Sequence, residues 1–396
     1  MATNDDKVKL MNMCYGDNNQ SYLLTQVLGS GGEGEIYRIK DCDNCVAKIF
    51  KKREYQRDAK IRVLKEFQWS DDIRKYVVLP QVILYEDMER TRQCGYVMDK
   101  VDCSTLLTDT FVGDHPLSIK MRAIVGINIC KALEAIHMNG GNSQAQLLIG
   151  DFNFNNIVVN RDTGDIRIIG ADCVHLTIKQ ADGRDAGDIC IIDDNGVYLP
   201  IRQKDGYEIF PCTVLYPDLF MPEIFKLMKT NPNTNLAQLC SNGYQTFSIY
   251  TDYYCMAYHL HLLLLNCTPF DYSIHNPYDG KRTLIMNGNY SYSNLFNPAI
   301  LSVYCPDFDI LTSELKELFI RAFEKGANQP EIRPSPSEFI SALSAYIDDL
   351  TLCNCSRQEH YVRKGYQSES CEWCRIENII GKYNKKDNYG EFCWEW

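Results

Sequence analysis

The feature that most constrains the fold is a run of three short β-type stretches near the start of the chain, within residues 21–50. Glycine and turn residues separate the stretches, which read YLLTQVLG, GEIYRIK and NCVAKIF. Strands this close in sequence pair as an antiparallel meander. One amphipathic helix is expected over 53–69, and two more strand-like runs follow at 76–85 and 94–101. The first hundred residues therefore predict a small antiparallel β lobe with one helix.

Beyond Ser104 the apolar residues recur at helical spacing. Helices are expected over 118–137, 251–265, 313–325 and 335–350. A β-hairpin is expected around the turn NRDTGD, after the first of these helices. Residues 172–222 show little periodicity, which is typical of a functional loop. The whole chain is therefore expected to be of the α+β class.

Glycines mark the turn between the first two strands. They stand at Gly29, Gly31 and Gly34, and Ile36 follows two residues after the last. Where side chains are absent, backbone N–H groups lie close to anionic oxygens, so the pattern suits a loop that cradles phosphates. A dinucleotide-binding fingerprint needs a helix directly after the glycines, whereas a strand is expected here. The pattern favours a kinase-type loop, with an ordinary glycine-rich hairpin as the alternative.

A lysine lies within the third strand. Lys48 has apolar residues on both sides, and a buried ammonium group is costly without an anionic partner. A lysine on the strand after the loop is also where a kinase-type site holds phosphates. The following helix offers three acids as partners, Glu54, Asp58 and Glu66, and the distance along the chain favours Glu66. A lysine on an edge strand without a special role is the alternative.

An aspartate and an asparagine stand directly after the long helix and before the hairpin, in the sequence GDFNFNNI. These are Asp151 and Asn156. A carboxylate suits a base that orients a hydroxyl group, and an amide oxygen five residues later suits a metal ion on the phosphates. The loop, Lys48 and this pair occur in the order of a phosphotransfer site. Asp151, Asn156 and Lys48 are therefore the expected catalytic residues.

The chain resembles the protein-kinase fold over residues 21–349. Met221-Pro222-Glu223 looks like the A-P-E motif that ends the activation segment, and Asp252 with Ala257 looks like the motif of the central buried helix. Arg333 stands where the family keeps the arginine that pairs with the glutamate of A-P-E. Within the superfamily the chain looks most like bacterial kinases with an H-G-D-F-N-x-x-N catalytic loop and a small metal-binding tail.

The resemblance implies a bilobal fold, with a β lobe over 21–98 and a helical lobe over 99–349. It implies that Met98 is the gatekeeper and that the backbone of Val101 faces an adenine. ATP with Mg²⁺ or Mn²⁺ would be the cofactor, and Ser/Thr of a protein would be the acceptor. The residues expected to bind the cofactor are Gly29, Gly31, Gly34, Lys48, Met98, Val101, Asn156 and Asp172.

The sequence departs from the kinase pattern at several positions. The register from Asn156 places Gly170 where the family keeps the metal-binding aspartate of D-F-G, and Asp172 is two positions further on the same face of a strand. Ile149 replaces the usual histidine and Asn153 replaces a lysine. Two interpretations follow: a protein kinase with a compromised metal site, and a pseudokinase that binds nucleotide or partners without turnover. A small-molecule kinase is a third, which the residues of the protein-substrate lobe argue against.

The net charge of the chain and the composition of its first twenty residues limit the partners and the cellular compartment that we expect. Of 396 residues, 41 are Lys or Arg and 52 are Asp or Glu, a formal net charge of -11. A surface this acidic offers no electrostatic footprint for nucleic acid or an anionic membrane, so neither is expected as a partner. Residues 1–20 read as a loose polar extension without the apolar core of a secretory signal. A cytoplasmic protein with reduced thiols is expected.

The eighteen cysteines divide into two groups. Those within apolar strands and helices are expected to be small buried hydrophobes. The tail, 350–396, holds Cys371-x-x-Cys374 and a histidine, His360, with Cys355 or Cys353 further upstream. A Cys-x-x-Cys pair with one more Cys and a His suits a closed tetrahedral structural zinc site, for which Cys355 is preferred to Cys353. A redox or incidental thiol pair is the alternative.

Overall fold

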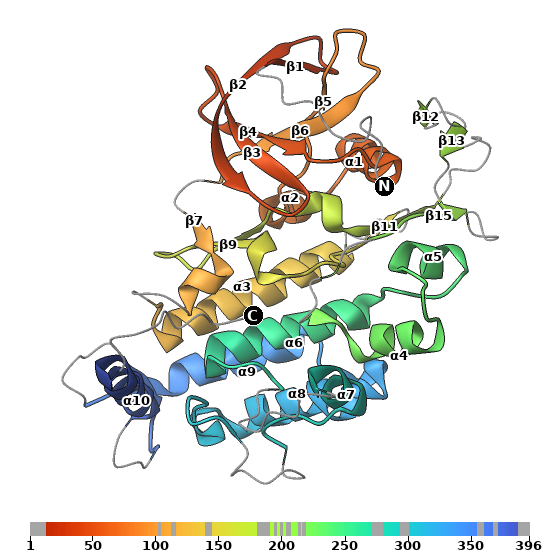
Figure 1. Cartoon of the computed structure of the whole chain (residues 1–396). Helices are drawn as coiled ribbons and strands as arrows, with labels where there is room; N and C mark the ends of the chain where they lie inside the picture. The colour runs from red at the N-terminus through yellow and green to blue at the C-terminus, as the bar shows by residue number, and fades with distance from the viewer. Residues whose placement is uncertain are drawn as a thin grey trace. The chain divides into compact units, whose positions relative to one another are not determined.

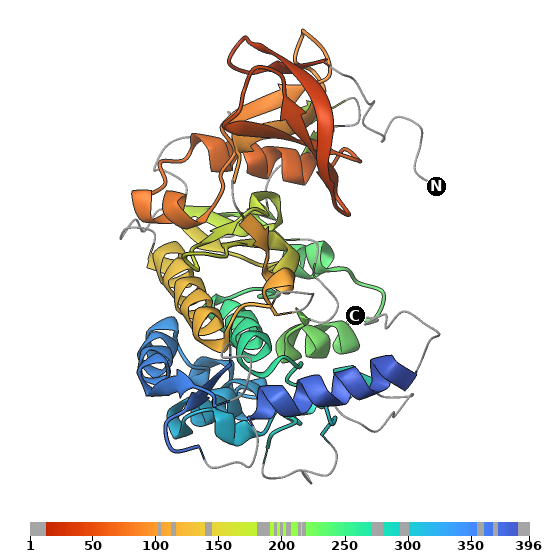
Figure 2. The same ribbon diagram turned by 90° about the vertical axis from the view of Figure 1, so that its left-hand side faces the viewer.

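The structure is a computed structural model, drawn in Figures 1 and 2. It describes residues 13–101, 104–111, 116–138, 145–179, 191–193, 196–198, 201–202, 207–212, 215, 219–270, 280–293, 301–354, 360–366 and 371–386. The chain is α+β, as expected, and divides into two compact units. Unit 1 takes the described residues of 1–104, 135–149 and 167–213, and unit 2 those of 105–134, 150–166 and 214–396. The expected domains, 21–98, 99–349 and 350–396, stay a prediction.

Six antiparallel strands form a closed barrel in unit 1 (Figure 1, red to orange). The strands are β1 (Met13–Gly16), β2 (Ser21–Ser30), β3 (Gly34–Ile39), β4 (Cys45–Phe50), β5 (Val82–Tyr85) and β6 (Gln93–Asp99). Their order around the barrel is β1-β2-β3-β4-β6-β5, and β1 pairs with β5 to complete it. Closure leaves this sheet without an exposed edge.

Strand β1 corrects the expectation of a loose extension up to residue 20. Met13–Gly16 pairs with β2 through Cys14↔Tyr22 and with β5 through Tyr15↔Tyr85. The side chain of Cys14 is buried in the barrel core. A four-residue strand is too short for its alternation to stand out in a polar segment, so the sequence predicted an antiparallel sheet that begins at residue 21, without this strand.

Alternation along β4 separates the barrel core from the face that carries Lys48. Ala47 and Ile49 belong to the buried core cluster, together with Val97 of the neighbouring strand β6. Successive side chains of a strand point to opposite faces, so Lys48 points away from that cluster. Its cross-strand partner in β6 is Tyr96, which therefore shares its face.

The remainder of unit 1 consists of two helices and short strands. They are α1 (Tyr55–Glu66), α2 (Asp71–Tyr76), β8 (Ala145–Leu148), the 3₁₀ turn η5 (Ala171–Cys173), β11 (His175–Lys179), β12 (Ile191–Asp193), β13 (Gly196–Tyr198), β14 (Ile201–Arg202) and β15 (Tyr207–Phe210). One sheet has the order β14-β15-β11-β8. The expectation that 172–222 lacks regular elements was therefore wrong. Strand β11 depends on pairing with the distant β8, and local periodicity does not report such pairing.

Unit 2 is mainly helical, and the expected helices are confirmed to within a few residues. Its elements, which include most of α3 and β7 and only the first residue of β10, are β7 (Ser104–Leu106), η2 (Leu107–Thr110), α3 (Ile119–Met138), η4 (Phe154–Asn156), β9 (Ile157–Asn160), β10 (Ile166–Ile168), α4 (Pro222–Thr230), α5 (Leu236–Ser241), α6 (Ile249–Leu265), α7 (Gly280–Asn287), η9 (Phe308–Ile310), α8 (Ser313–Phe323), η10 (Lys325–Ala327), η11 (Pro330–Ile332), α9 (Pro336–Asp349), β16 (Leu350–Leu352), β17 (Tyr361–Arg363) and α10 (Glu372–Lys386). The expected hairpin is β9–β10, in a sheet of order β10-β9-β7.

Helix α6 is the buried centre of unit 2 (Figure 1). Its side chains are almost all buried, including His259 and His261. None of the helices in the described ranges is long and apolar enough to cross a membrane. The tail adds α10, which appears as a long blue helix in Figure 2 and which the sequence did not predict. It is held to unit 2 by Arg375, which donates to the carbonyl oxygens of Val303 and Cys305 at 2.8 and 2.9 Å.

Candidate functional site

The glycine-rich loop joins β2 to β3. The backbone N–H of Gly31 donates to the carbonyl oxygen of Gly34 at 2.9 Å, which closes the turn. A Cβ atom on Gly34 would lie 2.6 Å from the carbonyl oxygen of Ile49, so packing requires glycine there. A Cβ atom on Gly29 or Gly32 would meet nothing within 4 Å. The backbone beside Gly29 and Gly32 is thus open to a ligand.

Lys48 forms a buried ion pair with Asp172. Its Nζ donates to both carboxylate oxygens, at 2.6 and 2.7 Å, and the hydroxyl group of Tyr96 donates to Oδ1 at 3.1 Å. The side chain of Asp172 is fully buried and that of Lys48 is 14% exposed. Burial opposes ionisation of Asp172, but the Lys48 ammonium outweighs burial and holds the pKa of this carboxyl well below its ordinary value of 3.8. The structure therefore joins two residues that lie 124 positions apart in the sequence.

Helix α1 does not supply the acid that the sequence predicted for Lys48. Glu66 is exposed at the end of the helix, and Glu54, which precedes the helix, lies 3.8 Å from Arg57. Asp58 is buried, and burial is the main cause that raises its pKa to about 7. The partner of Lys48 is Asp172 instead, because η5 brings it to the outer face of the barrel.

The local backbone explains why Asp172 reaches Lys48. Gly170 precedes η5 with φ −97° and ψ 48°, and Asp172 is the middle residue of that turn. The sequence placed Asp172 on the same face of a strand as Gly170, whereas the chain has already left the strand at Ile168. That Gly170 takes the place of a metal-binding aspartate stays a prediction.

The two residues expected near an adenine lie at the end of β6. Met98 is buried and pairs with Val46, and it shares a strand face with Tyr96, two positions earlier. Val101 follows the strand and is partly exposed. Both lie on the β4–β6 side of unit 1 that carries Lys48. Their contact with a nucleotide stays a prediction.

Asp151 and Asn156 lie together in a tight loop of unit 2. The side-chain nitrogen of Asn156, Nδ2, donates to the backbone carbonyl oxygen of Asp151 at 3.0 Å. The side-chain oxygen of Asn156, Oδ1, has no hydrogen-bond donor among the described residues. Asn153 Nδ2 donates to Asp151 Oδ2 at 2.8 Å, and the backbone N–H of Asn155 donates to Asn153 Oδ1 at 2.8 Å. Asn153 thus fixes the orientation of the Asp151 carboxylate, which is buried.

Helix α6 anchors the backbone of this loop at two points. Asp252 Oδ1 accepts from the backbone N–H of Gly150 at 3.4 Å, and His259 Nε2 contacts the carbonyl oxygen of Phe152 at 2.6 Å. Gly150 has φ 68°, a conformation that favours glycine. Burial lowers the pKa of His259 to about 4, so the ring is neutral and Nε2–H is the donor. Asp151 lies between the two anchored positions.

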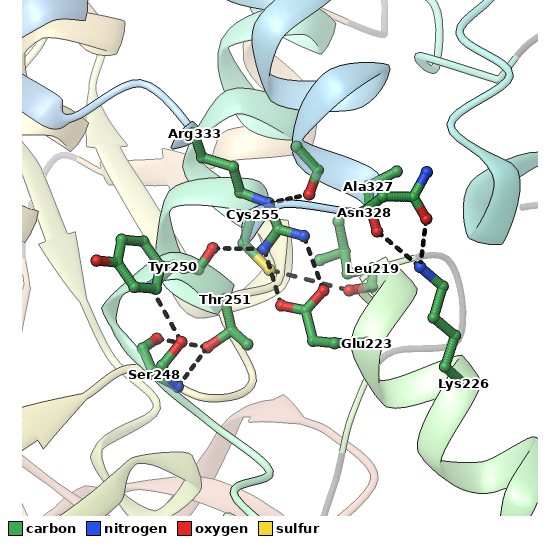
Figure 3. A network of polar contacts seen from close by, with 11 residues as sticks. Leu219, Glu223, Lys226, Ser248, Tyr250, Thr251, Cys255, Ala327, Asn328 and Arg333 are labelled. Atoms are coloured by element: carbon green, nitrogen blue, oxygen red, sulfur yellow. Dashed lines mark hydrogen bonds and ion pairs between the residues drawn. The ribbon is translucent and has the colours of Figure 1, made fainter. Parts of the chain in front are cut away.

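A second network fixes the start of α4 (Figure 3). The guanidinium group of Arg333 donates to both carboxylate oxygens of Glu223, at 2.8 and 2.7 Å, and to the carbonyl oxygen of Tyr250 at 2.7 Å. Its Nε donates to the carbonyl oxygen of Gly326 at 3.1 Å. Nearby, Lys226 donates to Ala327 and Asn328, at 2.9 Å each. The pairing of Arg333 with Glu223 that the resemblance implied is confirmed.

The tail brings three thiols together. The Sγ atoms of Cys353, Cys371 and Cys374 all lie within 4.8 Å of one another. His360 Nδ1 lies 3.7 Å from the sulfur of Cys371 and 3.4 Å from that of Cys374. Around a tetrahedral zinc with ordinary bond lengths, a sulfur and a nitrogen are about 3.6 Å apart and two sulfurs about 3.8 Å apart. The three thiols therefore fit one metal ion, and His360 Nδ1 lies beside two of them.

The carboxylate of Glu377 contacts the ring nitrogen of His360 that points away from the thiols. His360 Nε2 lies 3.1 Å from Glu377 Oε1, so Nδ1 is the nitrogen that faces the thiols. Metal-binding histidines usually bond a carboxylate or carbonyl in this manner. The preferred ligand Cys355 lies outside the described residues, and the clustered thiol is the alternative, Cys353. The backbone N–H of Cys353 donates to the carbonyl oxygen of His360 at 2.8 Å, next to the β16–β17 pair, which places its sulfur.

The remaining cysteines are largely as expected, with one correction. Cys130, Cys255 and the other described free cysteines of the two units' cores are buried. Cys42 and Cys45, however, form a disulfide across the turn between β3 and β4. The expectation that all thiols are reduced was wrong at this pair, because the turn brings two cysteines three positions apart within bonding distance.

Comparison with known proteins gives no family for the chain. No protein-family model matches it, and no curated protein matches it either. Function is therefore proposed from the geometry of the site.

Sequence reasoning missed three residues of the site. Tyr96 shares Asp172 with Lys48, and His259 anchors the Asp151 loop. The third is Glu33 of the glycine-rich loop, whose pKa is raised above its ordinary value of 4.5 by burial and, after it, by the neighbouring charge of Asp172. The pairing of the two strands could have placed Tyr96 beside Lys48. The roles of His259 and Glu33 depend on long-range contacts, which local sequence patterns do not predict.

Proposed function

We propose that the chain is an ATP-binding, protein-kinase-like phosphotransferase of bilobal fold with an altered metal site. The observation that carries the proposal is the Lys48–Asp172 pair beside an open glycine-rich loop. A strand lysine that an acid holds in place next to such a loop is the arrangement that binds nucleotide phosphates in kinases. All three parts belong to unit 1, which is therefore the proposed nucleotide-binding unit.

Unit 2 contributes the residues proposed to act on the acceptor. A hydroxyl group must be oriented and deprotonated for phosphoryl transfer, and Asp151 is the carboxylate proposed for this role. Asn153 holds it by a 2.8 Å hydrogen bond, and α6 fixes the backbone on either side through Asp252 and His259. The Glu223–Arg333 pair favours a protein acceptor, Ser or Thr, over a small molecule, because in kinases it stabilises the protein-substrate lobe.

The residues present fit Mg²⁺ or Mn²⁺ poorly. Asn156 offers one amide oxygen, Gly170 offers no side chain, and both oxygens of Asp172 accept from Lys48. Hard divalent cations prefer several oxygen ligands, usually including a free carboxylate. This shortage is the specific observation that favours the second candidate function, a pseudokinase that binds nucleotide or a partner without turnover.

Transfer of radiolabelled phosphate from ATP to a protein acceptor separates the two candidates. For a kinase, the wild-type protein transfers phosphate and Asp151→Ala loses that activity by about a thousandfold, because the base is removed. For a pseudokinase, transfer is absent and arises only in Gly170→Asp. The φ of −97° at Gly170 lies outside the left-handed region that favours glycine. Stabilisation by ATP in thermal unfolding tests nucleotide binding, and no shift with either metal would contradict the proposal.

We also propose that the tail holds a structural zinc through Cys353, His360, Cys371 and Cys374. Three thiolates and one imidazole leave no open position for water, so the ion would staple the tail. A segment this short with few aliphatic residues gains folding free energy from such a cross-link.

Metal analysis of purified, reduced protein is expected to find about one zinc per chain. Cys353→Ser is expected to lose it, since its thiol lies with those of Cys371 and Cys374. Cys355→Ser is the matched variant and is expected to retain the metal. The reverse result, with zinc lost only in Cys355→Ser, would assign the fourth ligand to Cys355. A protein without zinc in every variant would contradict the site.

A further inference from the structure

A buried arginine of helix α1 lies on the face of the barrel that carries Lys48. The central carbon of the Arg57 guanidinium group, Cζ, lies 3.7 Å from the ring centre of Phe50. Phe50 stands two positions after Lys48 on β4, so these two side chains share a strand face. A cation this close to the face of an aromatic ring is attracted to it. The ring of Phe50 therefore holds the guanidinium group in place.

The last glycine of the glycine-rich loop lies beside both cations. Gly34 is the cross-strand partner of Phe50 in the β3–β4 pair. A Cβ atom on Gly34 would lie 3.5 Å from Cε of Lys48, so the lysine side chain runs directly past this glycine. Lys48 and Arg57 are thus two positively charged side chains at the same end of the loop, one beside Gly34 and the other over its strand partner.

The guanidinium group of Arg57 has donors to spare. Its Nη2 donates to the carbonyl oxygen of Lys52, and its Nη1 lies 3.8 Å from a carboxylate oxygen of Glu54. Within the described part of the chain, Nε is buried and has no hydrogen-bond partner. The side chain of Arg57 is 7% exposed and that of Glu54 is 40% exposed, so this acid is a weak partner for a buried cation. A buried arginine with unused N–H groups suits an anionic ligand.

The same site is poor in ligands for a divalent cation. Gly170 carries no side chain, and both carboxylate oxygens of Asp172 accept from Lys48. Phosphate groups still need positive charge beside them, and arginine supplies such charge in phosphoryl-transfer sites as metal ions do. A guanidinium group is planar, always charged, and matches two phosphate oxygens with two parallel donors. Arg57 therefore offers the charge that a metal ion would otherwise bring.

We propose that Arg57 is the second phosphate-binding cation of unit 1 and that it makes nucleotide binding largely independent of a divalent cation. The proposal rests on the proposed nucleotide site and assigns the group that takes over the charge of the metal ion. Lys48 and Arg57 bind different phosphate groups of one triphosphate, since they lie beside two paired positions of β3 and β4. The ring of Phe50 already orients the guanidinium group, so binding orders little that is free.

The test is calorimetric titration of the full chain with ATP in Mg²⁺, with ATP in EDTA, and with adenosine. For the wild type, the dissociation constants for ATP in EDTA and in Mg²⁺ are expected to agree within about threefold, because two side chains offset the phosphate charge. In Arg57→Met the constant for ATP in EDTA is expected to rise about tenfold to a hundredfold, since hydrogen bonds to a charged group are lost. The constant for adenosine, which carries no phosphate, is expected to change about twofold or less.

Arg62→Met is the matched control. Arg62 is also an arginine of α1 over an aromatic ring, with Cζ 5.8 Å from the ring centre of Tyr85, and its Nε donates to Gln93 at 3.1 Å. Tyr85 belongs to β5, which pairs with β1 and β6, whereas the glycine-rich loop joins β2 to β3. This variant is expected to bind ATP and adenosine as the wild type does.

The outcomes separate this proposal from the one on which it rests. A wild type that binds ATP in Mg²⁺ but loses more than about thirtyfold in affinity in EDTA depends on the metal ion and overturns the proposal. Equal losses of adenosine and ATP in Arg57→Met would show that Arg57 supports the fold rather than the phosphates. If Lys48→Met loses ATP and Arg57→Met binds it as the wild type does, the role of Arg57 is contradicted and the nucleotide site stands. A wild type that binds neither ATP nor adenosine would contradict both proposals.

Discussion

Lys48→Met is expected to abolish stabilisation by ATP and to lower the free energy of unfolding by about 3 kcal/mol. The change leaves the fully buried Asp172 carboxylate with the hydroxyl group of Tyr96 and without its cation. An unpaired buried charge is costly, so the loss exceeds what the ion pair itself contributes. Urea unfolding measures the stability, and thermal shift with ATP measures the binding.

A double variant distinguishes loss of the fold from loss of the ligand site. Lys48→Met combined with Asp172→Leu removes both charges, and an apolar pair in place of a buried ion pair is often neutral in stability. We expect this variant to recover most of the lost stability and still not respond to ATP. Lys40→Met, on an exposed lysine of the same barrel, is the matched control and is expected to change neither quantity. Recovery of the ATP response in the double variant would contradict the role of Lys48.

The pH dependence of the pair has a definite sign. The folded-state pKa of Asp172 is depressed, so its contribution to stability is fully present above the unfolded-state pKa, near 3.8, and is lost as pH falls below it. As the pH falls below 4, the free energy of unfolding is therefore expected to decrease more steeply for the wild type than for the double variant with Lys48→Met and Asp172→Leu. Equal slopes in acid unfolding would contradict the assignment.

The sequence predicted those parts of the molecule that local chemistry determines. The strands around Lys48 follow from alternation and glycine, and helices such as α3, α6 and α9 follow from periodic apolar residues with capping groups such as Ser335. The loop of Asp151 precedes the β9–β10 hairpin as expected, but β8 lies between it and the long helix that was expected directly before it. These features need no knowledge of distant contacts.

What the sequence could not predict depends on long-range pairing. Strand β1 forms only because β2 and β5 are both available to it, and Asp172 meets Lys48 only because η5 turns the chain. The choice between Cys353 and Cys355 as the zinc ligand depends on where β16 ends. The two cysteines are two positions apart, so a shift of two residues along the chain would exchange them. In each case several local options have similar free energies, and tertiary contacts select among them.

The Arg333–Glu223 pair is expected to contribute more to the stability of unit 2 than any exposed ion pair. The side chain of Arg333 is completely buried, and four hydrogen bonds use its guanidinium group, two of them to backbone carbonyls of Tyr250 and Gly326 (Figure 3). Its guanidinium carbon also lies 5.0 Å from the ring centre of Tyr254. Arg333→Ala removes every one of these contacts at once and leaves their acceptors unpaired.

We expect Arg333→Ala to lower the free energy of unfolding by about 3–5 kcal/mol, as for a broken buried pair. Glu223→Gln keeps the shape and one acceptor, so a loss of about 1.5–3 kcal/mol is expected. Arg333→Lys is expected to behave more like the alanine variant than the wild type, because an ammonium group cannot reproduce the bidentate fork. Arg321→Ala, which removes a partly exposed pair with Glu338, is the control and is expected to cost about 0–1 kcal/mol. Urea unfolding of the four variants decides the order, and a loss in Arg333→Ala no larger than in Arg321→Ala would show that the network does not stabilise the unit.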